Sequence, residues 1–163
     1  MSRILSEKEM NIRDRIIISL STFFGVGSLP LPGTAASLLG VFIFYLVKGN
    51  SSLHLGLTLF LILSGLLLAG KAEKIAGKKD AGCIVIDEVS GMLLSLLFLP
   101  YDIRIVIIGF LLFRILDTLK PYPADRLQSL PGGTGIMSDD IIAAIYANII
   151  LQFVFRLASF RMA

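Results

Sequence analysis

The stretch IVIDEVSGMLLSLLFLP, residues 84–100, places the acids Asp87 and Glu88 at the start of a long apolar run. Two other apolar runs also carry acids: Asp117 lies in FRILDTLKP, and Asp139 and Asp140 lie in GIMSDDIIA. A charged side chain at the centre of a membrane-spanning helix costs about 2.5–3.5 kcal/mol on insertion scales, so it usually faces a cavity, a partner charge or an ion. The five acids are therefore candidates for function.

The composition indicates an integral membrane protein. Of the 163 residues, 55% are hydrophobic and 17% are charged, and the mean hydropathy is +0.84, whereas soluble domains contain about 25% charged residues. Because no linker or repeat divides the chain, we expect a single domain over residues 1–163. The net charge is only +3, with dispersed basic residues, so nucleic acid is not an expected partner. The oligomeric state is left open.

The apolar runs predict an all-α fold, a polytopic membrane bundle of about five spanning helices. The expected spans are residues 34–48, 53–70, 84–100, 104–119 and 140–157, each close to the 17–25 residues that a span needs. The run from Ile16 to Phe24 is too short to cross a membrane, and we expect it to form a re-entrant or interfacial segment.

Basic residues cluster in three regions that we expect to be cytoplasmic. These regions precede the first span (Arg3, Lys8, Arg13, Arg15), separate the second and third (Lys71, Lys74, Lys78, Lys79), and separate the fourth and fifth (Lys120, Arg126). The basic segment 1–15 also holds Glu7, Glu9 and Asp14, which is untypical of a signal peptide. In this topology all five acids reach the cytoplasmic membrane boundary, so residues far apart in the chain are predicted to share one pocket.

The five acids favour a hard divalent cation. Oxygen donors without a cluster of His or Cys suit Mg²⁺, which proteins usually hold with one or two carboxylates, waters and substrate phosphate. A metal would also offset the repulsion between these acids and an anionic substrate. Asp139 and Asp140 have an alternative interpretation, in which Ser138 or an Asp simply caps the following helix.

Cations and glycines at the same boundary are candidate phosphate contacts. Arg114, Asp117 and Lys120 recur every three residues and so lie within roughly 120° on one helix face. The alternative for Arg114 is a pair with Asp117 that only neutralises both charges. Turns holding Gly33 and the pair Gly132 and Gly133 precede helices and could cradle phosphate, although such glycines often only form turns.

His54 and Cys83 are not expected to take part. His54, the one histidine, lies near a predicted outer loop and is read as an ordinary interfacial residue. Cys83 has no neighbouring base or cation that would activate a thiol, so we expect a small apolar filler.

The motifs together resemble the phosphatidylglycerophosphatase A family, small bacterial membrane phosphatases. The resemblance spans roughly residues 24–148, through PLPGTAAS, IVIDEVSGM, FRILDTLKPYP and GGTGIMSDDIIAA in the family's order. It implies Mg²⁺-dependent hydrolysis of phosphatidylglycerophosphate to phosphatidylglycerol and phosphate, on the cytoplasmic side of the bacterial inner membrane. It also implies that the five acids are the metal and catalytic residues, with Lys120 and Arg114 binding phosphate and Thr34 assisting. Ala36 and Ala144 replace glycines that are frequent in the family.

Several questions remain open at the level of sequence. The nucleophile could be a water molecule or a carboxylate such as Asp87 or Asp139. Intramembrane acids also line ion paths, so a cation transporter is an alternative, although acids confined to one boundary do not form a continuous path. A further alternative is a non-catalytic membrane subunit, which would have been free to lose some of the acids.

Overall fold

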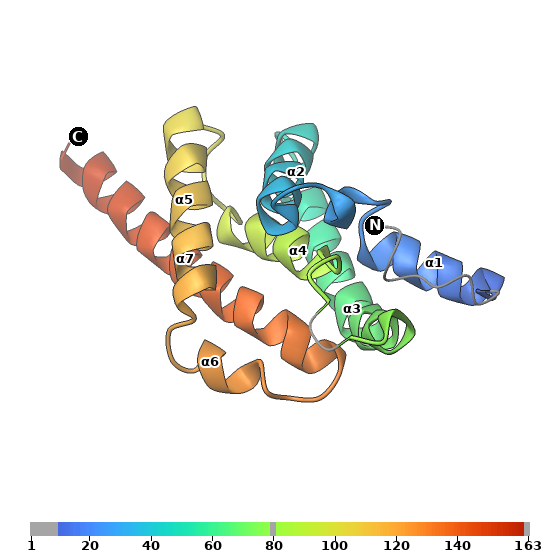
Figure 1. The fold of residues 1–163 in the computed structure, drawn as a ribbon. Coiled ribbons are helices and arrows are strands. Elements are labelled where there is room, and N and C mark those ends of the chain that lie inside the picture. Colours follow the sequence, from blue (N-terminus) through green and yellow to red (C-terminus); the bar gives the residue numbers. More distant parts are fainter. Residues whose placement is uncertain (1–9, 79–80, 162–163) are drawn as a thin grey trace.

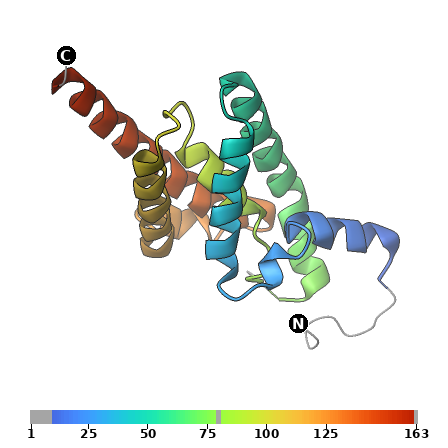
Figure 2. The same ribbon diagram turned by 90° about the horizontal axis from the view of Figure 1, so that it is seen from above.

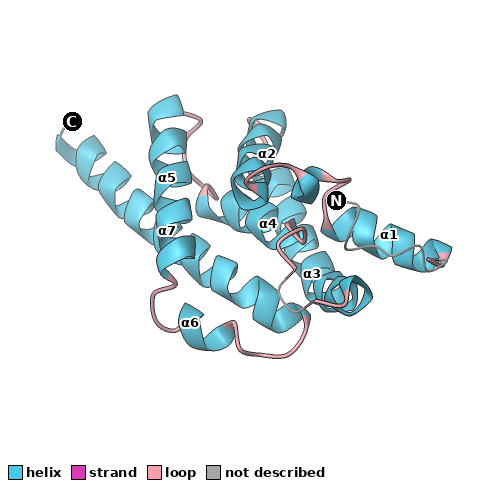
Figure 3. Cartoon of the chain, in the orientation of Figure 1, coloured by secondary structure: helices cyan, strands magenta, loops and turns pink. Residues whose placement is uncertain are grey.

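The computed structural model describes the backbone of residues 10–78 and 81–161, with side chains up to Leu157. Arg3, Lys8 and Lys79 of the basic regions, and Glu7 and Glu9, lie outside the described residues. The described chain is helical and contains no strand (Figure 3), which confirms the predicted all-α class. Its elements are α1 (Ile12–Ser21), the short 3-10 helix η1 (Val26–Ser28), α2 (Pro32–Leu46), α3 (Ser51–Ala76), α4 (Ile86–Ser95), α5 (Ile103–Leu119), α6 (Ala124–Leu127) and α7 (Gly133–Arg161).

The short helix α4 lies at the centre of the bundle. It packs against α2, α3, α5 and α7 (Figures 1 and 2), and eight of its ten residues are buried. Met92 and Leu93 of α4 join one hydrophobic core with Phe44 of α2 and Phe113 of α5. A helix that is apolar around most of its circumference is stable only when other elements surround it. The surrounding helices therefore hold the start of α4 in the protein interior.

Two of the predicted spans form helices that are long and apolar enough to cross a membrane, α3 and the part of α7 from Gly133 to Leu157. At about 1.5 Å per residue, each exceeds the roughly 30 Å of a bilayer core. The runs 34–48 and 104–119 form the shorter helices α2 and α5, of 15 and 17 residues.

The prediction of a spanning helix over residues 84–100 is wrong. Only Ile86–Ser95 is helical, which gives a length of about 15 Å. The helix ends in turns, in which the Leu97 amide bonds to Leu94 and the Leu99 amide bonds to Leu96, and Phe98 has a φ of +59°. The apolar run reflects burial inside the protein rather than a path across lipid.

The outer faces of the bundle expose large apolar side chains. Examples are Leu38 and Phe42 of α2, Phe60 and Leu63 of α3, Ile107 and Leu111 of α5, and Ile149 and Phe153 of α7. Soluble monomers rarely expose contiguous apolar surface on this scale, and such surface marks contact with membranes or partners. With the two long apolar helices, it indicates a membrane-associated protein.

The helix α1 covers part of the run predicted to be re-entrant or interfacial. It packs against α3 and projects from the edge of the bundle (Figure 1). Ile12, Ile16 and Leu20 recur every four residues and are 74%, 53% and 38% exposed, so they form an apolar stripe on one face. Such a stripe beside Arg13 and Arg15 is typical of a helix that lies in a membrane interface, and this placement stays a prediction.

Candidate active site

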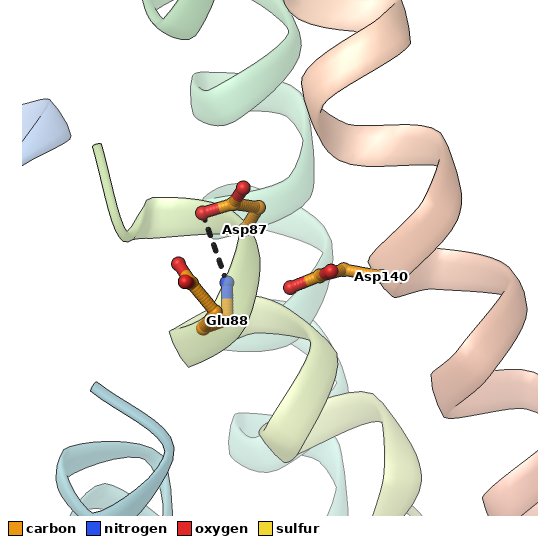
Figure 4. A group of neighbouring side chains, drawn as sticks. All are labelled: Asp87, Glu88 and Asp140. Carbon is orange, nitrogen blue, oxygen red and sulfur yellow. Dashed lines mark hydrogen bonds between the residues drawn. The ribbon is translucent and has the colours of Figure 1, made fainter. Parts of the chain in front are cut away.

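Asp87 and Glu88 occupy the first turn of α4, where the helix dipole favours acids. The Val85 amide donates a hydrogen bond to the Ser21 carbonyl at 2.9 Å, which fixes the start of α4 against the end of α1. Asp87 Oδ1 accepts a hydrogen bond from the Glu88 amide at 3.1 Å (Figure 4). That amide is one of the helix-start donors without an intrahelical partner. The backbone thus helps to orient the Asp87 carboxylate.

Asp139 and Asp140 lie in the second turn of α7. The helix already begins at Gly133, and the Ser138 hydroxyl donates to the Thr134 carbonyl within it at 2.5 Å. The alternative in which Ser138 or an Asp caps this helix is therefore wrong. Both acids are buried, with 7% and 3% of their surfaces exposed, so their position needs an explanation other than capping.

Three carboxylates from two helices converge at the centre of the molecule. Asp140 reaches from α7 toward Asp87 and Glu88 of α4 (Figure 4), and one oxygen from each lies within 4.8 Å of the others. Oxygen atoms at this separation could ligate one cation. The predicted convergence of acids from distant parts of the chain is thus found for these three residues, which we call the acid trio.

Several oxygens at this site lack a partner. Glu88 Oε2, Asp139 Oδ1 and Asp140 Oδ2 are buried without a hydrogen bond in the described part of the chain. The helix α4 is not one of the two helices long enough to span a membrane. Burial raises the pKa of Asp87 in α4 well above its ordinary value, and repulsion from Glu88 raises it further. Buried polar atoms are normally paired. Unpaired carboxylate oxygens beside one another fit a hard cation, so the residues present are suited to Mg²⁺.

The other two predicted acids are each paired with a cation. Arg114 donates to Asp117 Oδ2 at 2.8 Å, as the neutralising interpretation of that pair predicted. Lys120 donates to Asp139 Oδ2 at 2.5 Å and to Gln128 Oε1 at 2.8 Å. Both pairs flank the acid trio and link α5 and the following loop to the site. Among the described residues no cation forms an ion pair with Asp87, Glu88 or Asp140, although the Arg114 guanidinium lies close to Glu88.

Gly33, at the start of α2, is in direct contact with this group. A Cβ atom at this position would lie 2.9 Å from Glu88 Oε1 and 3.1 Å from the Arg114 guanidinium nitrogens. Only glycine therefore lets α2 pack this closely without displacing Glu88 or Arg114. The structure places Gly33 beside Glu88 and Arg114, and its predicted role in cradling phosphate stays a prediction.

A polar pocket of about 790 Å³ adjoins the trio. Asp87 and Asp139 lie in its wall. The remaining described residues around it come from the end of α3, from α6 and the loop after it, and from the start of α7: Glu73, Lys74, Asp125, Gln128, Ser129, Leu130, Pro131, Gly132, Gly135 and Ile136. The pocket is therefore an access route to the buried acids that is large enough for a phosphate-bearing headgroup.

Gly132, Gly133 and Thr34 are the other residues predicted to contact phosphate, and their positions give less direct support for that role. Gly132 lines the pocket, whereas a Cβ at Gly133 would lie 2.3 Å from the Leu66 carbonyl oxygen, so this glycine permits close packing of α7 on α3. Thr34 is half-buried in the first turn of α2, and no described hydrogen bond joins its hydroxyl to an acid of the site. Phosphate binding by these residues stays a prediction.

His54 and Cys83 belong neither to the acid trio nor to the described lining of the pocket. His54 is only 2% exposed, and its Nε2 is 3.0 Å from the Leu93 carbonyl oxygen, so the prediction of an ordinary interfacial histidine is wrong. His54 is near the start of α3, whereas Lys74 of the pocket is near the end, about 30 Å along the helix.

Cys83 is half-buried and packs at the edge of a second hydrophobic cluster, as expected of an apolar filler. Ala36 and Ala144 are fully buried in the main core.

The sequence did not reveal Lys74 and Gln128 as residues of the site. Gln128 lies beyond the turn that follows α5, and its contact with Lys120 depends on how that turn folds. Lys74 belonged to a basic cluster that could be read only as a signal of topology. Lys74 lies four residues after Gly70 and therefore on the same face of α3. That face can be assigned to the site only once the contact of Gly70 with α7 is known.

Fold and site together define a membrane-associated helical protein in which a buried carboxylate group opens onto a polar pocket. The family model described as phosphatidylglycerophosphatase A matches residues 19–155. The chain therefore belongs to the phosphatidylglycerophosphatase A family and is a phosphatase. The resemblance noted from the motifs is confirmed.

Three curated relatives are similar over most of the chain, and two of them bear the name of this family. A phosphatidylglycerophosphatase A of Escherichia coli is 40% identical over 139 residues, which covers 83% of this chain and 81% of the relative. That of Haemophilus influenzae is 38% identical over 141 residues, covering 81% and 84%. A Bacteroides thetaiotaomicron protein, provisionally named a phosphatidylinositol-3-phosphatase, is 33% identical over 144 residues, covering 82% and 90%. No solved structure matches the chain.

Proposed function

We propose that the protein removes the terminal phosphate of phosphatidylglycerophosphate, releasing phosphatidylglycerol and inorganic phosphate in glycerophospholipid synthesis, and that it requires Mg²⁺. The observation that carries the proposal is the acid trio, whose buried oxygens lie next to a polar pocket. Family membership supports the reaction, because two relatives bear the name of this phosphatase.

Asp87, Glu88 and Asp140 would hold the ion, with Asp117 and Asp139 beside them. When bound, Mg²⁺ supplies positive charge that offsets the acids and polarises a phosphate oxygen. The donor set supports this choice of metal, because it consists of carboxylates without histidine or cysteine. A phosphomonoester carries about −1.5 to −2 charges at neutral pH, so the acids alone would repel the substrate.

The chain's own residues position the reacting groups. Asp87 and Asp139 are the acids that line the pocket and so face a bound headgroup. Either can accept the proton of an attacking water or attack phosphorus directly. Lys120 holds the Asp139 carboxylate in place through Oδ2, and Oδ1 has no hydrogen-bond partner in the described ranges 10–78 and 81–161.

We place the site at the cytoplasmic face of the bacterial inner membrane, in a multi-pass protein. Lys71, Lys74 and Lys78 lie at the same end of α3 as the pocket, and basic residues favour the cytoplasmic side. The apolar outer faces of α2, α3, α5 and α7 would then contact lipid. Acyl chains of the substrate would stay in the bilayer while the headgroup enters the pocket.

Phosphate release by the purified protein in detergent tests this proposal. We expect Mg²⁺-dependent release from phosphatidylglycerophosphate, abolished by a chelator and by Asp87→Asn in a protein that remains folded. Phosphatidylinositol 3-phosphate belongs in the same assay, since the Bacteroides relative is named for it. Preferred hydrolysis of that lipid would overturn the proposed substrate, and full activity of Asp87→Asn would overturn the proposed site.

A further inference from the structure

The pocket beside the acid trio has an uneven distribution of charge. Among the described residues that line it, four are acids, Glu73, Asp87, Asp125 and Asp139, and Lys74 is the one cation. A phosphate group entering this pocket therefore meets a single positive side chain in the described wall. Lys74 differs in charge from the other ionisable residues of this described wall, which are all acids.

The packing of α3 against α7 directs Lys74 toward the pocket. A Cβ at Gly70 would lie 2.5 Å from the Gly133 backbone nitrogen, so the two helices touch at this point. Residues four apart lie on the same face of a helix. Lys74 is therefore one turn beyond the contact, on the face of α3 that is turned toward the start of α7 and the pocket.

Lys74 differs from the two cations that the sequence singled out. Arg114 and Lys120 are already bonded to Asp117 and Asp139. Lys74 is exposed, and within the described residues it forms no ion pair or hydrogen bond. An ammonium group with three free donors is thus available to a ligand.

We propose that Lys74 binds a phosphate oxygen of the substrate headgroup. The inference rests on the proposed phosphatase function and adds a substrate-binding residue to it. The phosphate concerned is either the terminal group that is removed or the phosphodiester that links the headgroup to the lipid. Both present the same anionic oxygens, and an ammonium binds them as a point charge.

A different explanation is that Lys74 only stabilises the end of α3. A basic residue in the last turn of a helix interacts favourably with the helix dipole. The two explanations make different predictions, because a dipole contact would affect stability and leave the affinity for phosphate unchanged. Lys71 provides a matched control, since it is an exposed lysine one turn earlier that does not line the pocket.

The test compares Lys74→Ala, Lys74→Arg and Lys71→Ala in the full-length protein in detergent with Mg²⁺. We expect the KM of Lys74→Ala for phosphatidylglycerophosphate to rise by about tenfold or more, because a hydrogen bond to a charged group is worth at least this factor. Lys74→Arg should recover much of the loss, and Lys71→Ala should resemble the wild type. A parallel assay with a soluble phosphomonoester identifies the group bound: a raised KM there indicates the terminal phosphate, and a rise with the lipid alone indicates the phosphodiester.

Titration calorimetry with inorganic phosphate gives a reading that does not need turnover. Lys74→Ala should bind phosphate more weakly than the wild type if the terminal group is its ligand. An unchanged KM for the lipid, or equal changes in Lys74→Ala and Lys71→Ala, would overturn the inference while leaving the phosphatase intact. Absence of lipid hydrolysis by the wild type would instead refute the proposed function; weaker phosphate binding by Lys74→Ala than by Lys71→Ala would then still support Lys74 as a phosphate ligand, and equal binding would overturn the inference as well.

Discussion

The polar atoms at the two ends of α4 differ in their hydrogen bonding. At the C-terminal end, the Asn148 side chain donates to the carbonyls of Ser95 and Leu97 at 3.0 and 2.8 Å, and His54 lies 3.0 Å from the Leu93 carbonyl. At the N-terminal end, oxygens of Glu88 and of nearby Asp140 are buried without a hydrogen-bond partner among the residues that the structure describes. One end is closed by internal hydrogen bonds, whereas the oxygens at the other end would be satisfied by the cation that we propose.

This difference predicts that changes at the two ends separate activity from stability. Loss of a polar side chain at the closed end leaves carbonyls unsatisfied and should destabilise the protein. Loss of a charge in the acid trio relieves repulsion and burial of charge, so it should spare the fold and remove the function. Four substitutions test this separation, in order of decreasing effect on turnover.

Asp140→Asn should have the largest effect. The neutral amide keeps the shape of the side chain but removes one ligand charge, so we expect kcat to fall by roughly 10²–10³-fold or more. Thermal unfolding in the absence of metal should occur at the same or a higher temperature, because a buried charge has been removed. Turnover close to that of the wild type would show that the trio is not the reaction centre.

Lys120→Met tests whether this lysine orients Asp139 or binds substrate. With the 2.5 Å pair lost, Asp139 should shift, and kcat should fall by up to about 100-fold with little change in KM. Steady-state kinetics beside Lys71→Met measures the effect. A rise in KM at constant kcat would instead support the phosphate contact expected from the sequence.

Gly33→Ala should lower kcat by about tenfold, because even a small displacement of catalytic groups is costly. The new methyl group would meet Glu88 Oε1 at 2.9 Å. Gly56→Ala is the matched control, since a Cβ there meets nothing within 4 Å, and a helical alanine should stabilise by about 0.5–1 kcal/mol. Equal activities of the two variants would argue against close packing of α2 on the site.

Asn148→Ala at the closed end should have the smallest effect on turnover. It removes the donors to two carbonyls, although Gln152 still donates to Leu97 at 3.1 Å. We expect a loss of about 1–3 kcal/mol in unfolding free energy, because buried acceptors are left unpaired. The kcat of the folded protein should stay near that of the wild type. A large fall in kcat would show that the C-terminal end of α4 is also needed for turnover, which would contradict the difference between the two ends.

The sequence predicted the parts of the fold that depend on local pattern. Apolar runs located α2, α3 and α5, and the acid motifs located the residues of the trio. The length of α4 could not be predicted, because a run such as 84–100 is equally apolar when it lies inside a protein and when it crosses lipid. The partners of Lys120 and the orientation of Lys74 depend on packing between distant helices, which no local pattern encodes.

The central claim is that Asp87, Glu88 and Asp140 hold a divalent cation. Titration calorimetry of the metal-free protein with Mg²⁺ in detergent tests it without reference to turnover. We predict saturable binding to the wild type that is lost or greatly weakened in Asp140→Asn and retained in Asn148→Ala. Equal Mg²⁺ binding by the wild type and Asp140→Asn, or no binding to either, would contradict the account.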